Sequence, residues 1–542
     1  MKNIKKLSIF ILCFTIILSC FNLGCSNDSG YITCVPTTTY VMEKTSANPK
    51  TIEVVFRTDR KENNSLGVLL GNNNDKDSFL NLEVSTLGCL SFTYVDENNV
   101  YYSCRFNKDV RTGEWIHLAI TWDYETIKCY VDGKLFKSNK LKVDSEPNFK
   151  NPFAIGGDLG SLNASYFKGQ IKSVALFSDV RTDKEISSDS SKVNKKADNL
   201  IAYYDFSNVD NKATTISDLS KNGITLNVKN DLIDNVSEPT DYEFSFMAIG
   251  DTQIVTFEYP DKLKNIYDYV LENVEKKKVK YVLGLGDITD NDTIEEWEVV
   301  VPQIKRMDGV VPYSIIRGNH DIFGTSNQML RESYYDKYFG GEDSFYAKQY
   351  IDCYKGYENE KFYARNTVHE FSSSTRDYLV ISLDYGPNDD ILAWANGVIE
   401  AHPNHNVIIT THAYINAQSK YINEETGGPA PTKHFADANN GDDLWNELVK
   451  KHKNIVMVIC GHISYSTIVL KQSTGENGNI VSEILIDPQG LDKKMGAMGM
   501  VATFYVGNDG KTVTVDYYST VHKKYYKSNN QYTFEIATVE RA

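Results

Sequence analysis

The stretch KYVLGLGDITDN, residues 280–291, decides the fold of the C-terminal half of this 542-residue chain. An apolar run of this kind predicts a buried strand, and the glycines and polar residues that follow it predict a turn at its end. The same succession occurs in FSFMAIGDTQ (244–253), PYSIIRGNHD (312–321), NVIITTHAY (406–414) and NIVMVICGHIS (454–464). We therefore expect a series of buried strands that each end in a polar loop.

Segments with helical spacing separate some of these strands. In PDKLKNIYDYVLENVEKKK (260–278), apolar residues recur at helical intervals, and Pro260 is well placed near the start of a helix. The segments EILIDPQG (483–490), MVATFYV (500–506) and KTVTVDYYSTV (511–521) add antiparallel strands. Strands that alternate with helices predict an α/β sandwich of mixed β-sheets flanked by helices, which we place at residues 243–542.

Side chains suited to metal binding follow the predicted strands. They are Asp251, Asp287, the run Asn319-His320-Asp321, His412 and His462. Loops at the carboxyl ends of such strands converge on one crevice, so residues that are distant in sequence can meet there. Each one alone has a structural explanation, because a carboxylate in a turn or a single hydrogen-bonded histidine is common. Their repetition along one chain favours a shared metal site.

The N-terminal half has a different periodicity. From about Thr51 to Asn227, short runs such as TIEVVFRT and FLNLEV alternate with period two between turn signals such as DENN and DG. This pattern predicts an all-β jelly-roll sandwich. Trp115 and Trp122 lie in an alternating strand, so we expect both in the core rather than on a sugar-binding platform. The polar segment 231–242 is the predicted linker.

The runs GEWIHLAITWD (113–123), CYVDGKLF (129–136) and FKGQIKSVALFSDVRTDKEI (167–186) resemble the laminin-G-like, concanavalin-type jelly roll. The resemblance covers most of residues 45–230, which we take as the domain. It implies attachment to a glycan or another cell-surface ligand, or alternatively a spacer without a ligand of its own, since a fold alone does not establish a ligand.

The motifs GDTQ, GDITDN, GNHD, TTHAY and GHIS resemble, in their order, those of the calcineurin-like metallophosphoesterases over about residues 244–489. The resemblance implies two divalent metal ions (Mn, Fe or Zn) and the hydrolysis of phosphate mono- or diesters. Two cations about 3.5–4 Å apart neutralise the phosphate oxygens and make hydroxide available near neutral pH. No Gly-rich nucleotide loop is present in the sequence, which favours hydrolysis over transfer from ATP.

The resemblance also assigns roles to individual residues. Asp287 would bridge the two ions. Asp251 and Gln253 would bind the first ion, and Asn319, His412 and His462 would bind the second. His320 would be the proton donor or transition-state stabiliser, oriented by Asp321.

Two departures from the family pattern concern the first metal. The family usually has DxH where this chain has Asp251-Thr252-Gln253, and GHxH where it has Gly461-His462-Ile463-Ser464. One explanation is an active site with a harder first metal such as Mn²⁺, to which His434 or Asp487 could contribute as a replacement ligand. The other is a catalytically impaired phosphoesterase fold that serves as a surface binding or adhesion protein. The intact Asn319-His320-Asp321 run favours activity.

The N-terminus predicts export. MKNIKKLSIFILCFTIILSCFNLGC has lysines before a short apolar core, which is typical of a signal peptide (residues 1–25) rather than a membrane-spanning helix. Cys20 fits a lipid attachment site, and Cys25 is the alternative. We expect a protein at the outer face of the bacterial cell membrane, lipid-anchored or else secreted, with a polar spacer at residues 26–44.

Charge and cysteine placement limit the partners and cross-links. A net charge of −15 argues against a nucleic-acid partner, and we expect membrane contact through the lipid anchor only. The expected partners are a phosphate-ester substrate and a glycan or surface ligand. Cys89 and Cys104 flank a predicted hairpin, where a disulfide or two small buried residues are both consistent with the sequence.

Overall fold

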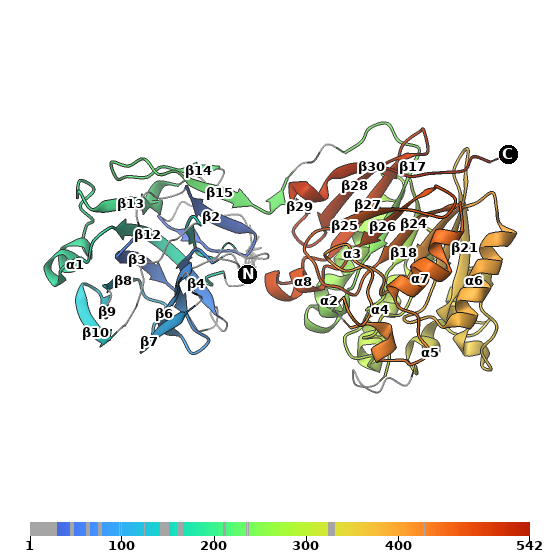
Figure 1. The fold of residues 1–542 in the computed structure, drawn as a ribbon, viewed down its shortest axis with the longest axis horizontal. Helices are drawn as coiled ribbons and strands as arrows, with labels where there is room; N and C mark the ends of the chain where they lie inside the picture. Colours follow the sequence, from blue (N-terminus) through green and yellow to red (C-terminus); the bar gives the residue numbers. More distant parts are fainter. Residues whose placement is uncertain are drawn as a thin grey trace, which may run out of the picture.

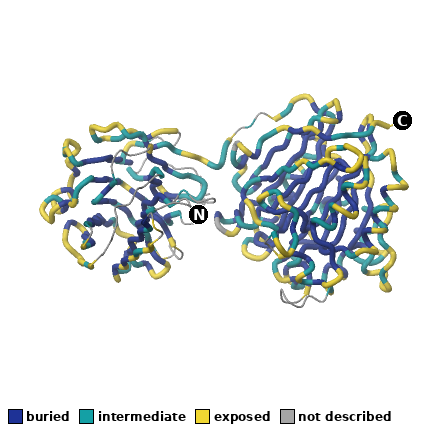
Figure 2. Tube along the Cα trace, viewed as in Figure 1, coloured by how far each residue is buried: buried dark blue, intermediate teal, exposed yellow. Residues whose placement is uncertain are grey.

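A computed structural model shows two domains joined by an extended segment (Figure 1). The structure describes residues 30–43, 48–60, 66–73, 79–96, 98, 100–123, 125–140, 151–157, 159, 166–209, 213–234, 236, 238–323, 331–426 and 429–541. The predicted export signal, with Cys20 and Cys25, lies outside the described residues. Figure 2 shows buried strands in the interior of both domains. The predicted architecture, an antiparallel β-sandwich followed by mixed sheets with helices, is confirmed.

The N-terminal domain consists of two antiparallel sheets. The first has the strand order β1-β12-β3-β8-β9-β10, with β13 paired to β12. Its strands are β1 (Ile32–Thr33), β3 (Thr51–Arg57), β8 (Ile116–Trp122), β9 (Thr126–Val131), β10 (Lys134–Lys140), β12 (Gln170–Phe177) and β13 (Leu200–Asp205). The second has the order β14-β15-β2-β11-β4-β5-β6-β7. Its strands are β2 (Thr38–Met42), β4 (Gly67–Gly71), β5 (Phe79–Val84), β6 (Cys89–Val95), β7 (Tyr101–Asp109), β11 (Ala154–Ile155), β14 (Thr215–Ile216) and β15 (Leu226–Asn230).

The sandwich starts earlier in the chain than expected. Strands β1 and β2 lie inside the predicted spacer 26–44, and β2 pairs with both β11 and β15. The threonines and the proline of this segment make it polar in sequence, but Tyr40 and Met42 are buried in the core between the sheets. The polar spacer is therefore shorter than predicted, because strands of two and five residues are too short to give a clear periodic signal.

One further prediction for this domain needs correction, and one question that the sequence left open is answered. Trp122 lies in the core, as expected, but Trp115 is half-buried outside it and contacts Tyr31, with Arg57 over its ring. In the predicted hairpin, Cys89 lies opposite Asp109 and Cys104 lies opposite Phe92. The two thiols are free, since the register places neither cysteine opposite the other.

The C-terminal domain contains two mixed sheets packed face to face. The first has the order β16-β29-β28-β27-β17-β18-β19, with β30 paired to β28, and the second has the order β20-β21-β22-β23-β24-β26-β25. The strands of the first are β16 (Leu232–Ile233), β17 (Phe244–Ile249), β18 (Val279–Gly284), β19 (Tyr313–Ser314), β27 (Met500–Val506), β28 (Thr512–Ser519), β29 (Lys524–Tyr526) and β30 (Tyr532–Glu535). Those of the second are β20 (Asp352–Cys353), β21 (Thr367–Ser372), β22 (Asp377–Ser382), β23 (Asn406–Thr410), β24 (Ile455–Cys460), β25 (Val469–Thr474) and β26 (Ile480–Leu485). Strand β16 shows that the predicted linker begins with a strand of this domain.

Helices cover the outer faces of both sheets. The domain has α2 (Gln253–Glu258), α3 (Pro260–Asn273), α4 (Ile294–Lys305), α5 (Tyr335–Phe339), α6 (Asp389–Ala401), α7 (Gly441–Glu447) and α8 (Gln489–Met495), whereas the N-terminal domain has the short α1 (Asp183–Asp189). Leu263 and Ile266 of α3 pack with Val282 of the first sheet, and Ile391 of α6 packs with Leu379 of the second. Pro260 is the first residue of α3, as predicted. Among the described residues, no helix is long and apolar enough to cross a membrane.

A buried ion pair holds the segment that leads into the Asn319 loop. Arg317 Nε and Nη2 lie 2.9 Å and 2.5 Å from the two carboxylate oxygens of Asp384, and both side chains are fully buried. The guanidinium also donates a hydrogen bond to the carbonyl of Arg331. The pair therefore ties residue 317 to the end of β22 in the opposite sheet.

We predict that Asp384→Asn destabilises the C-terminal domain by about 3–5 kcal/mol, because it leaves the Arg317 guanidinium buried without a counter-charge. Urea denaturation followed by tryptophan fluorescence measures the loss. The matched control is Glu447→Gln, which removes the exposed Glu447–Lys451 pair and should cost less than about 1 kcal/mol. Equal losses in the two variants would contradict a structural role for the buried pair.

Candidate metal centre

Asp287 lies just beyond strand β18, where the chain turns sharply. Gly286 has a φ of +90°, and Asp287 itself has a φ of +48°. A Cβ at Gly318 would lie 2.0 Å from Asp287 Oδ1, so only glycine allows the 318–321 loop to come this close. The backbone N–H of His320 then donates a 2.9 Å hydrogen bond to Asp287 Oδ1. The glycines of the GD and GNH motifs thus bring the two loops together.

His412 follows strand β23 and presents one ring nitrogen to Asp287. Its Nδ1 donates to the carbonyl of Leu285 over 2.8 Å. This contact leaves Nε2 facing the site, 3.3 Å from Asp287 Oδ2 and 3.3 Å from Asn319 Oδ1. A histidine held through its other nitrogen by a carbonyl is the arrangement that orients an imidazole for a metal.

His462 follows strand β24 and is held by two segments. Its φ is +75°, and its backbone N–H donates a 2.9 Å hydrogen bond to Asp251 Oδ2. Its Nε2 donates to the carbonyl of Pro429 over 2.8 Å, which leaves Nδ1 as the nitrogen available to a ligand. The ring lies 4.9 Å from the ring of His412 and 5.6 Å from that of Tyr385. Neither Pro429 nor Tyr385 lies in one of the sequence motifs, so the motifs did not predict these two contacts.

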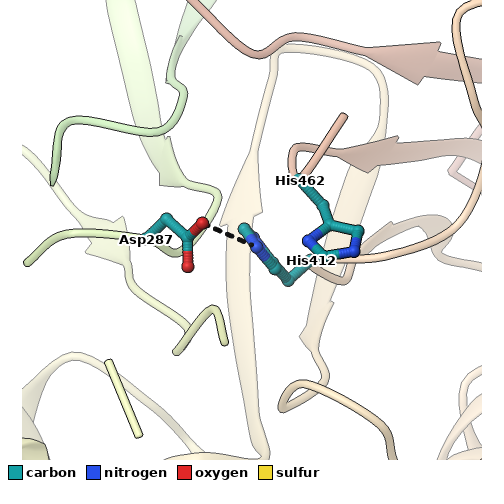
Figure 3. A group of neighbouring side chains, drawn as sticks. All are labelled: Asp287, His412 and His462. Carbon is teal, nitrogen blue, oxygen red and sulfur yellow. Dashed lines mark ion pairs between the residues drawn. The ribbon is translucent and has the colours of Figure 1, made fainter. Parts of the chain in front are cut away.

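The three side chains meet at one point (Figure 3). One potential ligand atom from each of Asp287, His412 and His462 lies within 4.8 Å of the others. Burial opposes the charge of Asp287, but His412, His320 and His462 hold its pKa below the usual range. Burial likewise opposes the charge of His412, and Asp287 raises its pKa. Burial and His412 lower the pKa of His462 to about 3, so this imidazole is neutral, the form that binds a cation.

His320 lies at the edge of the cluster with a hydrogen-bonding partner that we did not expect. Its Nδ1 lies 2.9 Å from the carbonyl oxygen of Asp290 and 3.4 Å from Asp290 Oδ1. Burial opposes its charge, but Asp287 and Asp290 raise its pKa. About a third of the side chain is exposed (36%), so the imidazole is accessible to a substrate.

Asp321, predicted to orient His320, instead connects two loops. Its Oδ1 accepts hydrogen bonds from the backbone N–H groups of Ile288 and Thr289, and its Oδ2 accepts one from Gly318. Asp321 therefore contacts the main chain, and the prediction that it orients His320 is wrong. The carboxylate thus fixes the spacing of the loops that carry Asp287 and Asn319.

The remaining predicted ligands, Asp251 and Gln253, are fully buried beside Asp287. Gln253 Nε2 donates to Asp287 Oδ2 over 3.1 Å. Among the described residues, neither Asp251 Oδ1 nor Gln253 Oε1 has a hydrogen-bond partner. Burial and the carboxylates of Asp487 and Asp287 raise the pKa of Asp251. Unpaired buried oxygens of this kind are costly unless a cation compensates them, so this donor set fits a divalent metal.

Three residues bear on the missing histidines, namely Ser464, which stands in place of one, and His434 and Asp487, which were considered as replacement ligands. Ser464 is exposed. His434 contacts the Tyr385 hydroxyl through Nδ1 at 2.7 Å. Asp487 is buried, with Oδ2 unpartnered among the described residues.

Comparison with known families assigns both domains. Residues 28–187 match the concanavalin A-like lectin/glucanases superfamily, and residues 244–465 match the calcineurin-like phosphoesterases. The CBM40 domain of the Ruminococcus gnavus IT-sialidase is 17% identical in sequence with a TM-score of 0.23, and the match covers 27% of this chain and 84% of that domain.

Two curated relatives are similar to parts of the chain. "Uncharacterized protein YvnB" of Bacillus subtilis is 26% identical over 311 residues, which are 56% of this chain and 22% of that protein. "Probable glycerophosphodiester phosphodiesterase GpdQ" of Arcobacter nitrofigilis is 24% identical over 229 residues, which are 40% of this chain and 70% of that protein. The chain thus spans about a fifth of the length of the first relative.

The family matches agree with the folds and with the buried Asp287, His412 and His462 group. A calcineurin-like phosphoesterase domain implies bound metal ions, and the donor set described above fits them. The chain therefore carries an N-terminal concanavalin A-like, laminin-G-type jelly-roll domain and a C-terminal domain that belongs to the calcineurin-like phosphoesterases.

Proposed function

We propose that this protein is a metal-dependent phosphoesterase that hydrolyses phosphate mono- or diesters at the bacterial cell surface. The observation that carries the proposal is the convergence of Asp287, His412 and His462, with ligand atoms within 4.8 Å of one another, beside Asn319. The similarity to a protein named as a glycerophosphodiester phosphodiesterase supports a phosphoester substrate.

The residues that would hold the ions fall into two groups around Asp287. Asn319, His412 and His462 would hold one ion, and Asp251 and Gln253 the other. Divalent cations in such a site supply neutralisation of the phosphate oxygens and a hydroxide nucleophile near neutral pH. Two contacts hold the site in position. The Asp321 carboxylate fixes the spacing of the loops, and the Leu285 carbonyl fixes the orientation of the His412 ring.

His320 would act on the leaving group. Its Nδ1 contacts the carbonyl of Asp290, so Nε2 is the nitrogen left for a substrate. The raised pKa, which Asp287 and Asp290 cause against the effect of burial, keeps a proton on the ring closer to neutral pH. A protonated imidazole at this edge of the site can donate that proton to the departing alkoxide oxygen.

The alternative function is binding without turnover. Gln253 and Ser464 stand where the family usually has histidines, and Ser464 is exposed. A phosphoesterase fold that lacks the first metal would bind phosphate or serve as a surface adhesin.

For the N-terminal domain we propose attachment to a glycan or another surface component, which the match to the lectin/glucanase superfamily supports.

Metal titration distinguishes the enzyme from the binding protein. We expect metal-stripped protein to hydrolyse p-nitrophenyl phosphate or bis-p-nitrophenyl phosphate only after Mn²⁺ is added, with activity rising up to two equivalents. Asn319→Ala should abolish turnover, because it removes the amide oxygen beside His412 Nε2. No turnover at any metal content would instead support a binding role.

Leaving-group dependence tests His320. We expect His320→Asn to lower turnover by about 10²–10⁴-fold for phenyl phosphate, whose leaving group needs a proton. The loss should be much smaller for p-nitrophenyl phosphate, whose leaving group is stable as an anion. Asp290→Asn is the companion variant, because it keeps the backbone carbonyl contact and should cost less. An equal loss for both substrates would assign His320 to phosphate binding alone.

We further propose export and lipid anchoring through Cys20 at the outer face of the bacterial membrane. Fatty-acid labelling of the full chain in a bacterial host should mark the wild type and Cys25→Ser, and it should leave Cys20→Ser unlabelled and in the medium. Labelling lost only in Cys25→Ser would move the anchor to that residue, and no labelling in the wild type would indicate simple secretion.

A further inference from the structure

No residue of the GHIS loop replaces the histidine that is missing at position 464. Ser464, at the second histidine position of the family motif, is exposed and so lies outside the buried group of oxygens. Gln253 supplies an amide in place of the other histidine, and its Oε1 has no hydrogen-bond partner among the described residues. A replacement ligand must therefore come from another segment that reaches Asp251.

Strand pairing brings Asp487 to this place. Strand β24 pairs in parallel with β26, and Cys460 lies opposite Leu485. The pairing continues beyond both strands, because the N–H of Ile486 donates to the carbonyl of Cys460 over 2.9 Å. Residue 487 thus leaves its strand beside residue 462. The N–H of Tyr465 donates to the carbonyl of Asp487 over 3.1 Å, which ties the segment to the GHIS loop.

Two glycines bring Asp251 against the same segment. A Cβ at Gly250 would lie 2.6 Å from the carbonyl oxygen of Ile486, and one at Gly461 would lie 2.1 Å from Asp251 Oδ1. The Gly250 Cβ position also lies 2.8 Å from Pro488 Cδ, so Asp251 follows a residue that packs against both neighbours of Asp487. Two neighbouring buried carboxyls repel one another when both are charged, so both can be ionised only where a cation compensates them.

That compensation is missing from the side chains around them. Asp251 is fully buried and Asp487 is 2% exposed, and Asp251 Oδ1 and Asp487 Oδ2 are unpartnered among the described residues. In the part of the chain that the structure describes, no lysine or arginine forms an ion pair with either carboxylate. The His412 ring lies against Asp287 instead. A divalent cation among these oxygens would supply the missing charge.

We propose that Asp487 replaces the histidine absent at position 464 and completes an all-oxygen first metal site with Asp251, Gln253 and Asp287, which lowers the preference for Zn²⁺ and lets Mn²⁺ in excess occupy it. Carboxylate and amide oxygens suit hard cations, whereas the second group, with His412 and His462, supplies the nitrogens that suit Zn²⁺. The inference rests on one part of the proposed function, namely that metal binds at Asp287.

Metal content after loading with a mixture tests the proposal. The purified full chain is stripped with a chelator, exposed to two equivalents of Zn²⁺ and a large excess of Mn²⁺, desalted and analysed by mass spectrometry of the metals. We expect about one Mn and one Zn for each wild-type chain. Two zinc ions and no manganese in the wild type would overturn the proposal.

Variants assign each ion to its ligands. Asp487→Asn should weaken Mn²⁺ binding at least a hundredfold and retain Zn²⁺, since removing even a residue that only hydrogen-bonds a ligand costs about 10–100-fold. His412→Ala should show the opposite, with Zn²⁺ lost and Mn²⁺ retained. Asp487→His should convert the chain to two zinc ions. An Asp487→Asn protein that still binds both metals with wild-type affinity would refute the role of Asp487.

Matched controls separate ligand loss from misfolding. Asp516→Asn also neutralises a buried carboxylate, one that accepts a hydrogen bond from Tyr505, and should leave the metal content unchanged. Circular dichroism confirms folding, and if Asp487→Asn does not fold, the wild-type mixture and Asp487→His decide the question. Because metal content is read without turnover, one Mn and one Zn in an inactive protein would contradict the proposed function and support the site.

Discussion

The burial of the Asp287 carboxylate is the constraint on which the catalytic half of the molecule depends. A carboxylate with almost no access to solvent is costly unless its oxygens are compensated. Here the compensation comes from the His320 backbone N–H, the Gln253 amide and the His412 ring. These groups belong to different strand ends in both sheets, so they meet only if the sandwich closes correctly. The site therefore forms only when the two sheets pack correctly. Gly286 and Gly318 permit the closest approach of the loops around Asp287, where a Cβ would clash.

The sequence predicted the layers and the strand ends, because buried strands and their glycine turns leave a strong periodic pattern. It did not predict which atoms meet. Asp321 follows His320 directly, and the chain order alone cannot show that its carboxylate faces the N–H groups of Ile288 and Thr289. The carbonyl of Asp290 contacts His320 through main-chain geometry, which no residue type reveals. The early strands β1 and β2 were missed for another reason, since two and five residues are too few to show a period.

The loop after β23 has a structural role that motif reading does not reveal. The carbonyl of Pro429 accepts a hydrogen bond from His462 Nε2–H. Tyr385 packs against His412 and His462, and its hydroxyl contacts His434. A carbonyl acceptor fixes the tautomer of His462 and so decides which nitrogen faces Asp287. Any rearrangement of residues 429–434 therefore changes the orientation of a ligand, which couples this loop to the metal centre.

The two halves of the centre differ in chemistry because they differ in how their donors are supplied. His412 and His462 enter from strands β23 and β24, where their second ring nitrogens find carbonyl partners. On the other side, Gln253 stands where the family has histidine and Ser464 is exposed, and the neighbouring strand β26 delivers a carboxylate instead. The end of strand β26 lies at the same edge of the sheet as the loop after β24 that lacks the histidine, since parallel strands have their carboxyl ends at one edge. Gln253 and Ser464 are therefore compatible with a complete first metal site. With Asp487 in place, they describe a centre in which one ion would have oxygen donors only and the other would also have the nitrogens of two histidines.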